Sequence, residues 1–194
     1  MDAMSTYPAV RRSEVVEILH GESVADPYRW LEDNDSAETA AFVREQNAFA
    51  EPHLAALPAR EAFRQRVSAL LTAPTRGCPS ERAGQVFAWH NDGQNQDVLV
   101  VADSVDSLDT GRILLDPNTL SDDGTKAVTV SAISPDGTLL AYGVADGGSD
   151  WRTLRIRDIA TGEDRADEIA WTKWNSPVWM PDSRSFTYWS YDAP

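Results

Sequence analysis

Hydrolytic chemistry needs a nucleophile with a base to activate it, and one serine of this chain lies in a glycine-rich setting. Ser149 is part of the segment Gly147–Trp151. A nucleophilic serine on a strand-to-helix turn requires a small residue two positions later, because the strained turn leaves no room for a side chain. Trp151 stands there instead. All three histidines also precede Ser149, so no base follows it in the order that such hydrolases use: His20, His53 and His90.

Another order of triad residues, such as His90, Asp136 and a later serine, can be written for this chain, but nothing in the local sequence marks it. The lone thiol, Cys78, lies between a glycine and a proline, which is typical of a loop residue. We therefore expect no catalytic residue within these 194 residues.

The sequence also does not support a metal-binding or a phosphate-binding site. No pair among the three histidines and one cysteine has the spacing of metal ligands. The cluster Asp122–Gly124 lacks the rest of a calcium-binding loop, so we interpret it as a turn. The glycines at 143, 147 and 148 are not followed by the Lys-Ser/Thr pair of a phosphate-binding loop. We expect no metal and no cofactor.

Composition and charge limit the kinds of partner that the chain is expected to bind. The chain has 42% hydrophobic residues, 25% charged residues and a net charge of -14, which is an ordinary globular composition. No stretch is basic enough to neutralise a run of phosphates, so we expect neither nucleic acid nor an anionic membrane surface as a partner. No segment approaches the ~20 apolar residues of a membrane span. A single cysteine allows no internal disulfide, and the start has no signal-peptide pattern, so the expected location is cytoplasmic.

The first 72 residues have helical patterns. Asp35 and Glu38 have the spacing of a capping box, which predicts a helix from about Ser36 to Glu51. A second helix is expected after Pro58, since proline suits a first helical turn. Its apolar stripe comprises Phe63, Val67, Leu70 and Leu71. The segment 72–79 is rich in residues that break helices and is interpreted as a linker.

After Pro79 the pattern changes to short apolar runs separated by turn residues, which predicts strands. The predicted strands are 85–90, 97–102, 112–115, 127–133, 139–144, 154–158, 177–179 and 185–191. The segment 132–142 also aligns with 178–188 at an offset of 46 residues, and both contain a Pro-Asp turn. Such a repeat is typical of β-propeller blades. A β-sandwich with two similar hairpins would give the same pattern.

Several motifs in sequence order resemble the prolyl oligopeptidase family of serine peptidases. The most specific is Asp26–Asp33, which reads Asp-Pro-Tyr-Arg-Trp-Leu-Glu-Asp. Further matches are Tyr7-Pro8, Arg11-Arg12, His20-Gly21, 91–96, 114–118, 120–124 and the Gly-Ser-Asp-Trp string 148–151. The resemblance implies a helical arm, a seven-bladed β-propeller and an α/β-hydrolase domain. An α+β fold is therefore expected, in which residues 1–72 form the arm and residues 73–194 form the first two-plus blades of an incomplete propeller. The α/β-hydrolase domain is expected to be absent from this chain.

The resemblance also implies a function. Full-length members are serine endopeptidases that cleave short proline-containing peptides after proline, and their propeller gates the active site. The present chain is expected to supply that propeller, to act with the missing hydrolase domain and to be inactive alone. In the family an aromatic residue in a Lys-Phe-Ser context lines the substrate pocket, and Trp174 takes that place here; the alternative is that Trp174 lies in a blade core. A non-catalytic protein-interaction module is the other function that the sequence allows.

Overall fold

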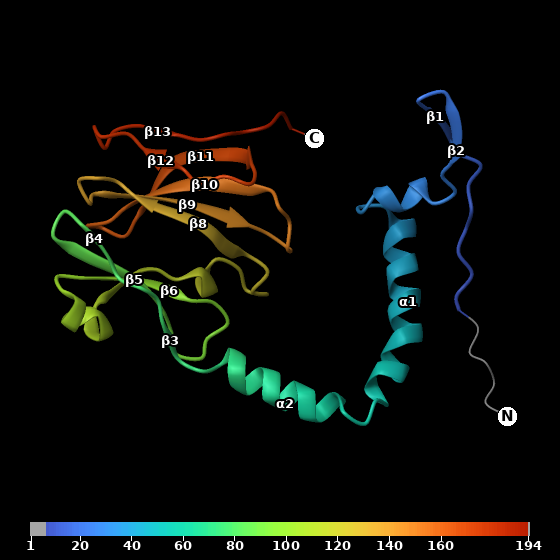
Figure 1. Cartoon of the computed structure of the whole chain (residues 1–194), viewed down its shortest axis with the longest axis horizontal. Helices are drawn as coiled ribbons and strands as arrows, with labels where there is room; N and C mark the ends of the chain where they lie inside the picture. The colour runs from blue at the N-terminus through green and yellow to red at the C-terminus, as the bar shows by residue number, and fades with distance from the viewer. Residues whose placement is uncertain (1–6, 194) are drawn as a thin grey trace. The chain divides into compact units, whose positions relative to one another are not determined.

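The computed structural model describes residues 7–193 and is shown in Figure 1. The chain falls into two compact units, Met1–Val67 and Ser68–Pro194. Each unit is described separately below.

The first unit opens with a small antiparallel hairpin of β1 (Val16–Leu19) and β2 (Glu22–Ala25). His20 and Gly21 turn it with φ values of 55° and 88°, as a two-residue hairpin turn with left-handed backbone requires. A 3-10 helix, η1 (Arg29–Glu32), and the helix α1 (Ala37–Ala55) follow. This hairpin was not predicted, because its strands are largely exposed and have no apolar alternation.

The predicted start of α1 was wrong in detail. Ser36 rather than Asp35 caps the helix: its hydroxyl accepts a hydrogen bond from the backbone N–H of Thr39 at 3.1 Å. The predicted second half of the capping box, Glu38, pairs with Arg11 instead. The helix also continues past the expected end at Glu51 to Ala55. Its interior Pro52 lies in the last turn and has no backbone N–H to donate to the preceding turn.

The second helix, α2 (Arg60–Leu71), begins two residues after Pro58. Its predicted apolar stripe is present, but all four side chains are exposed in this structure: Phe63, Val67, Leu70 and Leu71.

The second unit begins with an antiparallel sheet. It comprises β3 (Thr75–Arg76), β4 (Ser80–Arg82), β5 (Gln85–Asn91), β6 (Val98–Ala102) and β7 (Arg112–Leu115). Both β3 and β4 pair with β5, and β5, β6 and β7 then follow one another in chain order, so the strand order is β3-β5-β6-β7. Two 3-10 helices, η2 (Val105–Thr110) and η3 (Pro117–Thr119), flank β7.

A four-stranded meander and a strand pair follow (Figure 1). The meander runs in the order β11-β10-β9-β8 and comprises β8 (Ala127–Ile133), β9 (Leu139–Ala145), β10 (Arg152–Asp158) and β11 (Asp164–Thr172). The pair comprises β12 (Val178–Trp179) and β13 (Phe186–Thr187). All eight predicted strands exist, although β13 is shorter than the predicted range 185–191. The sequence did not predict β3, β4 or β11, and β3 lies within the segment 72–79 that was interpreted as a linker.

The core of the second unit lies between the sheet of β3–β7 and the meander of β8–β11. Its fully buried side chains include Phe87, Leu115, Leu140, Tyr142, Leu154 and Ile159. Polar groups also join the sheets: Arg157 Nη1 donates to the carbonyl oxygen of Leu114 at 2.9 Å, and Arg112 donates to that of Ile159. The same Arg157 pairs with Asp164, which accepts a hydrogen bond from the Tyr142 hydroxyl at 2.8 Å. These bonds fix the second sheet against the first.

The two turns that the 46-residue offset aligns have similar backbone conformations. Gly137 in the β8–β9 turn and Ser183 in the β12–β13 turn both have left-handed backbone, with φ of 70° and 57°. The two turns also contact each other, because the N–H of Asp136 donates to Ser183 Oγ at 3.0 Å. Trp179 Nε1 donates to the carbonyl oxygen of Ala132 at 2.9 Å. The β12–β13 pair is thus packed against the second sheet.

Candidate substrate-binding surface

Trp174 lies in the loop between β11 and β12, and the residue is 67% exposed. Trp174 therefore lies outside the cores of the sheets that the structure describes, and the alternative of a place in a blade core stays untested. Its backbone has a φ of 60°, a left-handed conformation that is unusual for a bulky residue. Three positions earlier, Trp171 has a φ of 58°. Two tryptophans with left-handed backbone thus lie within four residues of one another.

A group of aromatic rings surrounds this loop. The Trp151 ring packs edge-to-face against Trp171 and Tyr191, with centroids 5.6 Å and 5.8 Å apart. Both distances lie in the favourable range for aromatic pairs. The Trp171 carbonyl also accepts a hydrogen bond from the N–H of Tyr191 at 2.9 Å. The loop after β9, the end of β11 and the segment after β13 are thereby brought together.

Lys173 and Asn175 flank Trp174 and hold the loop. The Lys173 ammonium lies 4.6 Å from the Trp151 ring centroid and 5.5 Å from the Trp174 centroid. The Asn175 amide donates to two carbonyl oxygens, that of Lys173 at 2.8 Å and that of Trp189 at 3.0 Å. The loop is therefore tied by charge and by hydrogen bonds on both sides of Trp174.

A shallow apolar cavity of about 320 Å³ adjoins Trp174. Its lining includes Trp174, Val178, Tyr188 and Trp189, and large parts of these side chains are exposed. An aromatic, water-accessible surface with few polar groups is suited to binding an apolar side chain of a peptide. The structure therefore gives Trp174 an accessible site, and its role in binding substrate stays a prediction.

Sequence reasoning missed the partners of Trp174. Trp151 was considered only as the bulky residue after Ser149 and as part of the string 148–151, and Lys173 was not singled out. The pair of tryptophans at 171 and 174 could have signalled an aromatic surface. Its link to Trp151 was not visible, because the two segments pair through β10 and β11, and β11 was not predicted.

The other candidates behave as structural residues. Ser149 Oγ accepts a hydrogen bond from the backbone N–H of Trp151 at 3.1 Å, within a turn whose glycines have left-handed backbone. Asp123 accepts from the N–H of Thr125 at 3.0 Å, and this bond, with others, holds the pKa of Asp123 below its ordinary value. The interpretation of 122–124 as a turn is confirmed.

The three histidines and the cysteine are dispersed. His20 lies in the β1–β2 turn, His53 in the last turn of α1 rather than after it, and His90 is buried in β5. Cys78 is exposed. Across residues 7–193, no group of three potential metal ligands comes together. Within the same residues, no helix has the length and apolar character needed to span a bilayer.

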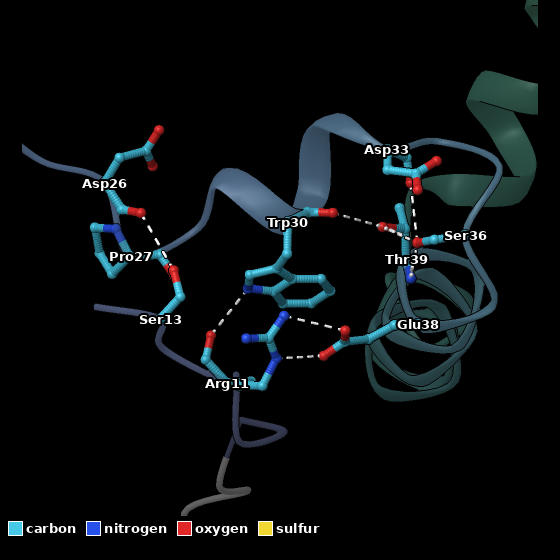
Figure 2. Close-up of polar contacts among 9 residues, drawn as sticks. All are labelled: Arg11, Ser13, Asp26, Pro27, Trp30, Asp33, Ser36, Glu38 and Thr39. Atoms are coloured by element: carbon cyan, nitrogen blue, oxygen red, sulfur yellow. Dashed lines mark hydrogen bonds and ion pairs between the residues drawn. The ribbon is translucent and has the colours of Figure 1, made fainter. Parts of the chain in front are cut away.

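The Asp26–Asp33 motif builds a local network in the first unit, and Figure 2 shows part of it. Trp30 Nε1 donates to the carbonyl oxygen of Arg11 at 3.1 Å, and the Arg11 guanidinium lies 5.0 Å from the Trp30 ring centroid. The same guanidinium pairs with Glu38 at 2.5 Å. Thr39 Oγ1 donates to the Trp30 carbonyl at 3.2 Å. The motif thus joins the extended N-terminal segment to η1 and α1.

A second part of this network surrounds the start of the motif. Ser13 Oγ donates to the carbonyl oxygen of Pro27 at 3.1 Å (Figure 2). Arg29 pairs with Asp26 at 2.5 Å and with Glu17 at 2.6 Å. The hydrogen bonds from Arg29 hold the pKa of both carboxyls below their ordinary values. The residues of the motif therefore have a structural role within the first unit.

Comparison with known proteins identifies the family. The family described as "Prolyl oligopeptidase, N-terminal beta-propeller domain" matches residues 7–194. A prolyl endopeptidase from Elizabethkingia miricola is 31% identical over 189 residues, which cover 97% of this chain and 26% of that protein. A prolyl oligopeptidase from Dendrothele bispora is 34% identical over 215 residues, covering 94% of this chain and 29% of that protein. The chain thus spans little more than a quarter of the length of these relatives.

Comparison with solved structures points to the same family. A structure from a study of two prolyl endopeptidases and their inter-domain dynamics has a TM-score of 0.80 and 36% identity, covering 93% of this chain and 27% of that one. Prolyl oligopeptidase B from Galerina marginata, bound to a 35mer hydrolysis and macrocyclization substrate, has a TM-score of 0.79 and 26% identity, covering 96% and 30%. These matches to a propeller domain decide against the β-sandwich. The chain belongs to the prolyl oligopeptidase family and matches its N-terminal propeller domain.

Proposed function

We propose that this chain is the N-terminal part of a prolyl endopeptidase that cleaves short peptides after proline. The observation that carries the proposal is the continuous match of residues 7–194 to the N-terminal propeller domain of that family. Relatives that share 31% identity over nearly the whole chain are named prolyl endopeptidases. In this proposal the nucleophilic serine, its base and the oxyanion-binding groups belong to a hydrolase domain outside the 194 residues.

The proposed division of the chain follows from the family architecture. Residues 1–72 would form the arm that belongs to the hydrolase domain, and residues 73–194 the first two blades and the start of a third in a seven-bladed propeller. Two antiparallel meanders followed by the β12–β13 pair support this division. The pair repeats the turn chemistry of the second meander at the 46-residue offset, as a further blade would.

In the complete enzyme the propeller would cover the active site and exclude folded proteins, so that only short peptides enter. Trp174 would then contribute an apolar ring to the substrate pocket. Its exposure and its cavity support this role, as do the peptide substrates with which the Galerina marginata enzyme was solved. A cytoplasmic location stays a prediction.

A fluorogenic peptide that contains Gly-Pro tests the proposal. The 194-residue chain alone should give no cleavage, because it has no serine with a base placed to activate it. A protein that joins this chain to its hydrolase domain should cleave the peptide after proline. The matched Gly-Ala peptide serves as the control and should be cleaved far more slowly.

Two results would contradict the proposal. Cleavage by the isolated chain that disappears in Ser149→Ala would place a nucleophile within these 194 residues. A complete protein that binds proline peptides without cleaving them would favour the interaction module instead.

A further inference from the structure

Trp174 combines two features that neither packing nor backbone preference explains. Its side chain is mostly exposed, so burial does not hold it in place. Its φ of 60° costs a non-glycine residue free energy relative to ordinary backbone. Such strain persists only where the surroundings enforce it, and it concentrates at functional sites. Some group must therefore hold this loop in its strained conformation.

Asn175 holds the backbone by its hydrogen bonds to the Lys173 and Trp189 carbonyls. The Lys173 side chain is the group best placed to hold the Trp174 ring. Its ammonium is close enough to both the Trp151 and the Trp174 rings, at 4.6 Å and 5.5 Å, for a cation–π contact with each. It also lies 4.0 Å from a carboxylate oxygen of Asp150, and its side chain is only 25% exposed. Asp150 and Trp151 follow β9, whereas Trp174 follows β11. Lys173 thus connects two loops that are more than twenty residues apart in the sequence.

This contact restricts the Trp174 ring. An exposed indole on a loop would otherwise exchange among rotamers, and each peptide that bound to it would have to immobilise it at an entropic cost. A cation held by Trp151 and Asp150 on one side favours the rotamer in which Trp174 also contacts it. The ring is then already oriented when a peptide arrives.

We propose that Lys173 is a positioning residue that orients the Trp174 ring for binding an apolar side chain of a proline-containing peptide. The inference rests on the proposed function, because it concerns the substrate site of that enzyme. It adds a role for a charged residue that does not itself touch the peptide.

The test compares Lys173→Met, Lys173→Arg, Trp174→Ala and the double variant Lys173→Met/Trp174→Ala in the complete enzyme. Lys173→Met keeps the length and apolar stem of the side chain and removes the charge. It should raise KM for the Gly-Pro peptide about twofold to fivefold, the equivalent of one partly exposed cation–π contact. The value of kcat should change little, because positioning affects uniform binding. Lys173→Arg keeps a cation over the rings and should restore KM.

The double variant shows whether Lys173 acts through Trp174. In the Trp174→Ala background, Lys173→Met should leave KM unchanged, because the ring that it orients is gone. The control is Lys126→Met, which removes the only other lysine of the chain and should have no effect.

The outcomes separate the two proposals. An additive effect of the two substitutions, no rescue by Lys173→Arg, or a fall in kcat and thermal stability with KM unchanged would each overturn the positioning role while leaving the enzyme assignment intact. If the unmodified enzyme does not cleave after proline, the proposed function fails and this role fails with it.

Discussion

Replacing Trp174 by glycine separates a binding role from a structural one. The exposed ring contributes little to folding, and its left-handed backbone costs about 1–2 kcal/mol in any residue with a Cβ. Glycine relieves this strain but loses about 0.5–1 kcal/mol through the greater freedom of the unfolded chain. Loss of the contact with Lys173 costs about 0.5–1 kcal/mol more. The net change in the free energy of unfolding should therefore lie within about 1 kcal/mol of zero.

The same substitution should weaken substrate binding much more than it changes stability. If the Trp174 ring buries an apolar side chain of the substrate, its removal costs about 1.5–3 kcal/mol of binding free energy. This corresponds to a KM about 10- to 150-fold higher for a Gly-Pro peptide, with kcat largely retained. Steady-state kinetics and thermal melting of the complete enzyme measure the two effects in one preparation.

The control for stability is Leu140→Ala, because Leu140 is fully buried in the core. That substitution should cost about 2–5 kcal/mol. If Trp174→Gly lowers the melting temperature as much as Leu140→Ala does, Trp174 is a structural residue after all. If KM is unchanged and stability is retained, Trp174 does not belong to the substrate site.

Two further predictions concern the units themselves. Ser36→Ala should destabilise α1 by about 0.5–2 kcal/mol through loss of the cap on the Thr39 N–H, whereas Ser36→Gly should cost only a few tenths; urea denaturation followed by helical circular dichroism measures both. Burial, together with the hydrogen bond to Asp164, raises the pKa of Tyr142 from its ordinary 10.0 to about 12. Because the folded-state pKa is the higher one, this contribution is complete below pH 10 and is lost between pH 10 and pH 12. Alkaline unfolding should show that loss in the unmodified protein and not in Tyr142→Phe.

The sequence predicted strands well where a run of apolar residues is bounded by turn residues. The exact ranges of β7 and β8 were predicted, and β5 and β9 were each extended by one residue. In contrast, β11 was missed because it is mostly acidic and polar and largely exposed. It forms a strand by pairing with β10, helped by the ion pair of Arg155 and Glu168. Such tertiary pairing overrides local propensity.

The candidate site could be predicted only in part. Trp174 was selected by family resemblance, whereas Lys173 and Trp151 as its supports were not. Trp171 and Trp174 in this loop also both have left-handed backbone, and no propensity favours that conformation for tryptophan. The predicted cap at Asp35 failed for a simpler reason: two adjacent residues can each cap a helix, and the backbone geometry selects Ser36.

Residues with left-handed backbone occur in the hairpin turns of the sheets and in the loops of this chain, and their backbone strain is offset differently in the two places. In the sheets, one hairpin solution is used twice: Asp136 and Asp182 each accept a backbone N–H two residues later, and a left-handed residue follows each of them. Gly137 fills that position without strain in one hairpin, whereas Ser183 fills it in the other and contributes its hydroxyl to the neighbouring turn. The strain at Ser183 is therefore offset by a bond between sheets. Among the described residues, no hydrogen bond from its own side chain offsets the strain at Trp174, whose only such support is the contact of its ring with Lys173. This difference is the reason to seek its purpose in binding rather than in folding.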